Sequence, residues 1–242
     1  MSDSPHPTYL TAQVFLAYAA EDWPSAEERG QNCAASSPAV AAIAALRQLL
    51  TEAQIAHWEC QPCRAADDSE SVISRAAEAC DNYLLVLTPR TLTDALCLQG
   101  LLFALSMNKR IVPVLAETVP VACLPEPLQA LSMIDLQTTA SLGQTAEGCQ
   151  LVQALRHEAS YHQAHTQLLV KALQWERQLR DPALLLNRAE LASCQLWLEK
   201  AKLRSRYRPI QLQTLYVATS ARHWNSRGIA TQTVGWLKQW LD

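Results

Sequence analysis

Two groups of side chains in this 242-residue chain have the types and spacing that could ligate a metal. His57, Cys60 and Cys63 form an H-x-x-C-x-x-C pattern, but zinc takes about four ligands and no second pair follows at a suitable spacing. His162 and His165 would share one face of a helix, yet the glutamate-bearing motif of helical zinc proteases is absent. We therefore predict no metal site and interpret these residues as loop, core and solvated side chains.

Cys97 could serve as a nucleophile, because a thiolate is favoured near the start of a helix. No G-x-S-x-G, Walker or G-x-G-x-x-G motif occurs in the sequence. With six glycines in the chain, a loop that cradles phosphate is not expected. A buried structural thiol is the interpretation that we prefer for Cys97.

The charge is divided between the two parts of the chain. Residues 1–150 contain 7 Lys and Arg against 17 Asp and Glu (net −10), whereas residues 151–242 contain 13 against 6 (net +7). A basic tail can attract an acidic partner, including the acidic part of a second copy. Nucleic acid is the other acidic partner to consider, but no recognition motif supports it.

The cysteines and the apolar runs bear on where the protein acts. Eight cysteines without a signal peptide predict reduced thiols and a cytoplasmic protein. The sequence lacks an uncharged apolar stretch of about 18 residues, so we expect no membrane span. The charged fraction of 18% is low for a solitary protein, which suggests surface that is buried in an assembly.

Apolar runs and helical patterns alternate through the first 147 residues. Strands are predicted at 13–19, 55–59, 83–89, 110–116 and 133–137, and helices at 38–54, 69–81, 90–108 and 126–132. This order predicts an α/β fold with a flavodoxin-like, doubly wound, five-stranded parallel sheet. Ligands in such sheets bind outside the carboxyl ends of the strands. Pro113 argues for an edge or bulge position of its strand.

Only helical signals follow, at 148–180, 181–204, 208–224 and 228–242. We therefore divide the chain into a leader (1–11), an α/β domain (12–147) and an all-α extension (148–242). Tryptophans in this extension are candidates for a helical core or a protein interface. They are Trp175, Trp197, Trp224, Trp236 and Trp240.

Five segments in order resemble bacterial TIR domains. "VFLAYAAED" is similar to their opening strand, with Tyr18 and Asp22, and "LRQLLTEAQIAHWE" to the following helix and strand, with Trp58 before an acid. "ESVISRAAEACDNYLLVLTPRTLTDALC", "KRIVPVL" and "MIDLQ" are similar to the later elements. The segment at about 160–222 resembles helices that follow TIR domains in bacterial WD-repeat and STAND-type signalling proteins. The resemblance implies a role in bacterial signalling or antiviral defence.

The resemblance also implies a place for an active site. Many bacterial TIR domains cleave the N-glycosidic bond of NAD, with a carboxylate three residues past a frequent cysteine in the helix after the central strand. That position is Gly100, and residues 95–116 contain no Asp or Glu. A carboxylate is needed there to stabilise a cation-like transition state, and glycine cannot do this. The corresponding nucleotide-pocket residues are Tyr18, Asp22, Trp58 and Cys97.

Two further expectations concern this pocket. Asp67, Asp68 and Glu70 stand where the family usually has glycine, and their charge would repel a pyrophosphate. The glycine at position 100 is interpreted as a place where the helix approaches another backbone closely.

We therefore expect a non-catalytic TIR-like adaptor or scaffold that acts through protein–protein contacts or self-assembly and needs no cofactor. Two alternatives stay open at this point: a TIR NAD hydrolase that is active on assembly, and a pseudoenzyme that senses an NAD-type nucleotide.

Overall fold

The computed structural model describes residues 13–23, 37–59, 66–137 and 142–239. Within these ranges, the side chains of residues 66–71 and 227–239 are not described. The chain forms two compact units, residues 1–163 and 164–242. The domain boundary that we place between residues 147 and 148 stays a prediction, and the leader at 1–11 lies outside the described residues.

A parallel five-stranded sheet is the centre of the first unit. Its strands are β1 (Val14–Ala17), β2 (His57–Glu59), β3 (Asn82–Leu87), β4 (Arg110–Leu115) and β5 (Ile134–Asp135), in the order β2-β1-β3-β4-β5. The central strand β3 is buried at all six positions, as expected of an apolar run covered on both faces. The strand order confirms the predicted flavodoxin-like, doubly wound sheet.

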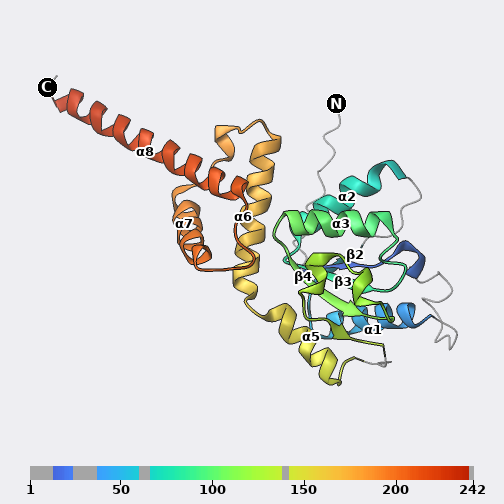
Figure 1. The fold of residues 1–242 in the computed structure, drawn as a ribbon. Helices are drawn as coiled ribbons and strands as arrows, with labels where there is room; N and C mark the ends of the chain where they lie inside the picture. Colours follow the sequence, from blue (N-terminus) through green and yellow to red (C-terminus); the bar gives the residue numbers. More distant parts are fainter. Residues whose placement is uncertain (1–12, 24–36, 60–65, 138–141, 240–242) are drawn as a thin grey trace. The chain divides into compact units, whose positions relative to one another are not determined.

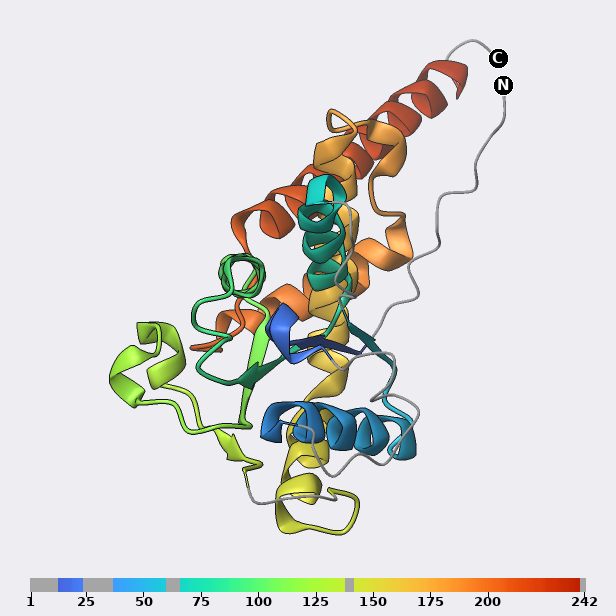
Figure 2. The same ribbon diagram turned by 90° about the vertical axis from the view of Figure 1, so that its right-hand side faces the viewer.

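Helices cover both faces of this sheet (Figures 1 and 2). On one face, α1 (Pro38–Glu52) and α5 (Ala146–Arg156) pack against side chains such as Leu16, Leu84 and Val114. On the other face, α2 (Ala66–Ala79), α3 (Ala95–Ser106) and the short α4 (Glu126–Gln129) pack against the alternate residues, such as Phe15 and Leu85. Successive strand residues thus supply the two cores in turn, because side chains alternate across a strand.

The expectation of an edge or bulge position at Pro113 is wrong for the strand as a whole, since β4 lies between β3 and β5 and pairs with β3 in continuous register. The strand β5 is only two residues long and pairs with Val114 and Leu115. Pro113 precedes these paired residues, so on that side β4 is locally unpaired where its proline lies. A strand inside the sheet can therefore carry a proline without losing a bond to this neighbour.

Three helices and a short 3₁₀ turn follow: α6 (Ala159–Arg177), η3 (Pro182–Leu184), α7 (Arg188–Lys202) and α8 (Gln211–Gln239). The single helix predicted at 148–180 is wrong, because the chain breaks at Glu158, where φ is +53°. The break predicted between 224 and 228 is also wrong, since α8 continues through it. Among the described residues, no helix has the length and apolarity needed to cross a membrane.

Candidate functional site at the carboxyl ends of the strands

Tyr18, Asp22 and Cys97 lie around the carboxyl ends of the strands β1 to β5, which we call the carboxyl edge. Tyr18 directly follows β1, and Asp22 ends the 3₁₀ turn η1 (Ala20–Asp22) that comes next. Trp58 lies within β2, where its ring packs against Phe15 with the ring centroids 5.0 Å apart. Trp58 therefore supports the core below the edge through its contact with Phe15.

Tyr18 belongs to a closed hydrogen-bonded triad. Its hydroxyl donates to Glu59 Oε2 over 2.9 Å, and Arg47 donates both to the Tyr18 hydroxyl (2.9 Å) and to Glu59 Oε2 (2.8 Å). The Arg47 guanidinium also lies 5.3 Å from the ring centroid of Trp23. Burial, together with the nearby Glu59 carboxylate, raises the pKa of the Tyr18 phenol well above its ordinary value. Tyr18 is thus a neutral donor, and Arg47 is already engaged by a carboxylate.

Asp22 is the most deeply buried acid of the edge, with only 1% of its surface exposed. Its carboxylate accepts hydrogen bonds from the Thr88 hydroxyl (2.9 Å) and from Arg90 Nε (2.5 Å). Arg90 also donates to Glu117 over 2.8 Å, and the hydrogen bond to Asp22 is the main reason that the pKa of Arg90 is raised. Asp22 therefore joins the chain after β1 to the turn after β3.

Asp94 was not among the predicted site residues, although it stands closest in sequence to the start of α3. Its two oxygens accept hydrogen bonds from the backbone N–H groups of Cys97 and Ala20, both over 2.8 Å. Asp94 is thus the N-cap of α3 and at the same time holds η1 in place. An acid directly before an apolar helical run is the sequence signal that could have identified it.

Cys97 lies in the first turn of α3 and is buried, with 8% of its surface exposed. Burial raises the pKa of its thiol to about 12, and the carboxylates of Asp94 and Asp22 act in the same direction. The thiolate is therefore scarce at neutral pH. This environment supports a structural thiol rather than a nucleophile.

Gly100 lies within α3 and is buried. A Cβ at this position would lie 2.8 Å from the hydroxyl oxygen of Tyr83 and 3.2 Å from Cγ2 of Ile73. The expectation that another backbone approaches Gly100 is wrong, because the nearest atoms belong to side chains of β3 and α2. A side chain at position 100 would therefore require Tyr83 and Ile73 to shift.

Negative charge is in excess at the carboxyl edge. Two guanidinium groups, those of Arg47 and Arg90, face six carboxylates, so the formal charge of these groups is −6 + 2 = −4. The carboxylates are those of Glu21, Asp22, Glu59, Asp94, Glu117 and Asp135. The side chains of Asp67, Asp68 and Glu70 lie outside the described part. A pyrophosphate would meet net repulsion from the described groups.

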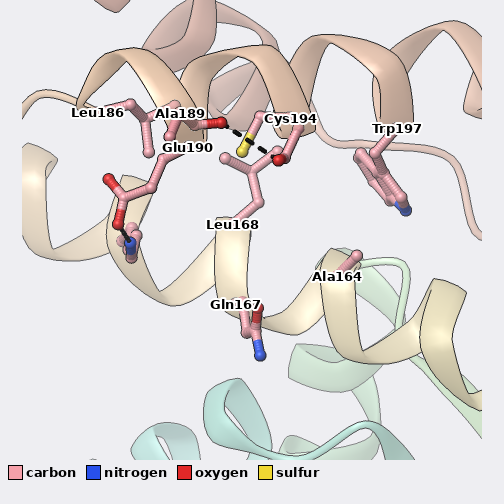
Figure 3. A pocket seen from close by; sticks show the side chains of 10 residues that line it. Ala164, Gln167, Leu168, Leu186, Ala189, Glu190, Cys194 and Trp197 are labelled. Atoms are coloured by element: carbon pink, nitrogen blue, oxygen red, sulfur yellow. Dashed lines mark hydrogen bonds and ion pairs between the residues drawn. The ribbon is translucent and has the colours of Figure 1, made fainter.

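The second unit contains a groove between α6 and α7 (Figure 3). Its volume is about 390 Å³, and its wall is mostly apolar, with Leu168, Leu186 and Trp197. An ion pair between Lys171 and Glu190, 2.6 Å long, crosses from α6 to α7 at its border. This arrangement joins the two helices, and nothing in it indicates which molecule would occupy the groove.

The predicted interface tryptophans take different places. Trp175 and Trp197 are 2% and 8% exposed, so both pack in the core of the second unit. Trp224 is partly buried and donates from its indole to the carbonyl of Leu186 over 2.7 Å. The side chain of Trp236 and all of Trp240 lie outside the described part.

The candidate metal ligands do not converge in the described part. No group of three or more His, Cys, Asp or Glu side chains there could hold a metal ion. Cys60 and Cys63 lie outside the described residues. His57 lies in β2, with Nδ1 3.4 Å from the carbonyl oxygen of Ile55.

Comparison with known proteins finds similarity over part of the chain. The TIR domain of a Toll-related receptor from Hydra magnipapillata is similar at a TM-score of 0.43 and 18% identity, over 60% of this chain and 99% of that chain. A metazoan TIR-STING receptor from C. gigas is similar at a TM-score of 0.38 and 20% identity, over 64% of this chain and 42% of that chain. No curated protein sequence matches. Residues 34–152 of this chain match the family model of the TIR domain.

Proposed function

We propose that this protein is a non-catalytic TIR adaptor or scaffold, which acts through protein–protein contacts in a bacterial signalling or antiviral defence assembly. The observation that carries the proposal is the environment of position 100. Where the family's NAD hydrolases have a carboxylate, this chain has a glycine, and Tyr83 and Ile73 fill the space that a side chain would need. The missing charge therefore cannot be supplied at this place without repacking the core.

The other acids of the carboxyl edge support the same interpretation. Asp22 and Glu59 accept hydrogen bonds from arginines, and Asp94 accepts two from the backbone. A carboxylate that stabilises a transition state must face the reacting atoms with an oxygen available. Moving one of these acids would break contacts that hold η1, β2 or α3 in place, and errors of about 1 Å can cost a factor of about 100 in rate.

The test is incubation of the purified full-length chain with NAD, followed by mass-spectrometric measurement of nicotinamide and ADP-ribose. We expect no release above that of a buffer blank. Release of both products in equal amounts, and its loss in Glu59→Ala or Asp94→Ala prepared in the same way, would overturn the proposal. The two substitutions separate activity of this chain from that of a contaminant.

A melting experiment with NAD addresses the alternative of a nucleotide sensor. A ligand at 100 times its Kd stabilises the folded protein by about 2.7 kcal/mol, which a thermal scan detects. We expect no shift, because the described groups at the carboxyl edge repel a pyrophosphate. A saturable rise in the melting temperature without product formation would favour a pseudoenzyme that binds nucleotide.

A further inference from the structure

The strongest concentration of positive charge lies where α7 ends and the chain turns towards α8 (Figure 1). Residues 200–208, which we call the basic segment, contain a cation at every second position: Lys200, Lys202, Arg204, Arg206 and Arg208. No acid interrupts them. These five cations are a large share of the 12 Lys and Arg in residues 164–242, which carry only 5 Asp and Glu.

Two cations of the basic segment are available to an external partner. Lys200 and Arg206 are exposed, and neither forms an ion pair with any described residue. Lys202, in contrast, pairs with Glu199 over 2.6 Å, and Arg208 donates to the carbonyl of Arg204. The segment therefore keeps net positive charge after its internal contacts are made.

An apolar side chain lies among these charges. Leu203, the C-cap of α7, is 91% exposed. Apolar side chains that charged groups surround are typical of protein interfaces, where the apolar residue gives contact area and the charges give orientation.

The first unit of the same chain carries charge of the opposite sign. Residues 1–163 contain 8 Lys and Arg against 18 Asp and Glu, a net charge of −10, whereas residues 164–242 have a net charge of +7. At the carboxyl edge, Glu21 and Asp135 are exposed, and the described charged groups sum to −4. We propose that the basic segment of one copy binds the acidic first unit of a second copy, at the carboxyl edge.

This inference rests on the proposed function and names the partner of its assembly. The basic segment and the carboxyl edge are different surfaces. Each copy can therefore bind one neighbour through its basic segment and another through its carboxyl edge. Such a contact builds either a reciprocal pair or a ring or filament. Association is then strong at low salt and weakens as salt shortens the screening length from about 10 Å at 0.1 M to about 3 Å at 1 M.

The experiment is sedimentation velocity of the full-length chain over a range of protein and salt concentrations. We expect the average mass to rise with protein concentration at low salt and to fall towards the monomer at 1 M salt. The double variant Lys200→Glu with Arg206→Glu is expected to weaken association by about tenfold or more. The matched control, Arg75→Glu with Arg222→Glu, makes the same change of charge at exposed positions away from the segment and is expected to stay within about twofold.

A charge exchange identifies the partner surface. The variant Glu21→Lys with Asp135→Lys is expected to lose self-association, and a mixture of this variant with Lys200→Glu/Arg206→Glu is expected to restore it. Restored association supports the proposal, because the two charge-reversed variants complement each other only if the basic segment and the carboxyl edge are in contact. If the mixture stays monomeric while the wild type associates, the partner surface is a different one and the proposal fails.

Two further outcomes also overturn it. A wild type that is monomeric at low salt, but binds vesicles containing phosphatidylserine or a single-stranded RNA through the basic segment, assigns the segment to lipid or to nucleic acid. Association that Lys200→Glu with Arg206→Glu leaves unchanged removes the segment from the interface. Neither result concerns NAD cleavage, so this inference can fail while the proposed function stands. Conversely, formation of nicotinamide and ADP-ribose would overturn the proposed function and leave the contact between copies untouched.

Discussion

The contact between Gly100 and Tyr83 allows a quantitative test of the packing that excludes a side chain from α3. In a helix interior, alanine is more favourable than glycine by about 1 kcal/mol. In Gly100→Ala this gain is opposed by the new Cβ, which would lie 2.8 Å from the Tyr83 hydroxyl oxygen. Overpacking of a well-filled core costs about 1–3 kcal/mol. We therefore expect Gly100→Ala to destabilise the first unit by about 1 kcal/mol.

Removal of the hydroxyl should reverse the sign. In Tyr83→Phe the nearest remaining atom of residue 83 is Cζ, at 3.8 Å, which is an ordinary contact distance. Only Cγ2 of Ile73, at 3.2 Å, must still shift, and it is one end of a side chain. In this background Gly100→Ala should therefore be neutral or stabilising, so the double-mutant cycle should give a coupling free energy of about 1–2 kcal/mol.

The assay is hydrogen exchange of the β3 and α3 amides in the full-length chain, which reports the opening of the first unit alone. Tyr216→Phe is the matched control, because Tyr216 lies in the second unit and donates to the carbonyl of Leu184. It should combine with Gly100→Ala additively, within about 0.5 kcal/mol. Additivity of Gly100→Ala with Tyr83→Phe as well would refute the steric account of position 100.

The remaining predictions concern buried polar groups of the first unit. Asp22→Ala should lower the free energy of unfolding by about 2–3 kcal/mol in urea denaturation, because it removes the buried carboxylate together with both of its hydrogen bonds, whereas Glu21→Ala at the exposed neighbouring position should change it by less than about 0.5 kcal/mol. Burial lowers the pKa of Lys109 to about 8, so the unfolded chain binds more protons between about pH 8 and 10.5. Relative to Lys109→Met, the wild type should therefore gain stability through this window, by on the order of 3 kcal/mol, in denaturation at several pH values. Iodoacetamide at pH 8 should modify the exposed Cys123 and leave Cys97 intact in the native protein, as peptide mass mapping can check, and rapid labelling of Cys97 would contradict its burial.

The parallel sheet follows from signals that are local in the sequence. The run Asn82–Leu87 is apolar enough to be buried on both faces, and strands alternate with helices at regular spacing. Parallel strands need crossovers, and right-handed crossovers leave few ways to connect such a chain. The alternation of strands and helices therefore predicts a parallel, doubly wound sheet, whereas the flavodoxin-like strand order is what the TIR resemblance adds.

The helix ends depend on tertiary contacts, which the hydrophobic periodicity of the sequence does not reveal. The apolar pattern predicts a helix from residue 90, but α3 begins at Ala95, because Asp94 caps it while also binding the backbone of Ala20. The break between α5 and α6 occurs at Glu158, which has a left-handed backbone without being glycine or asparagine. Neither residue type marks these ends by itself, and the partner of Asp94 is 74 residues away.

The candidate site shows the same limit in its chemistry. Tyr18 and Asp22, which the sequence suggests as pocket residues, and their neighbour Glu59 are residue types that a nucleotide pocket would use, and they lie after β1 and at the end of β2. Their role depends on where their hydrogen bonds go, and the structure directs them to Arg47, Arg90 and Thr88. A buried carboxylate that is paired in this way stabilises the fold only while both partners stay, since breaking the pair leaves an uncompensated charge. The polar groups of this edge therefore hold the loops together at the place where a ligand would otherwise be held.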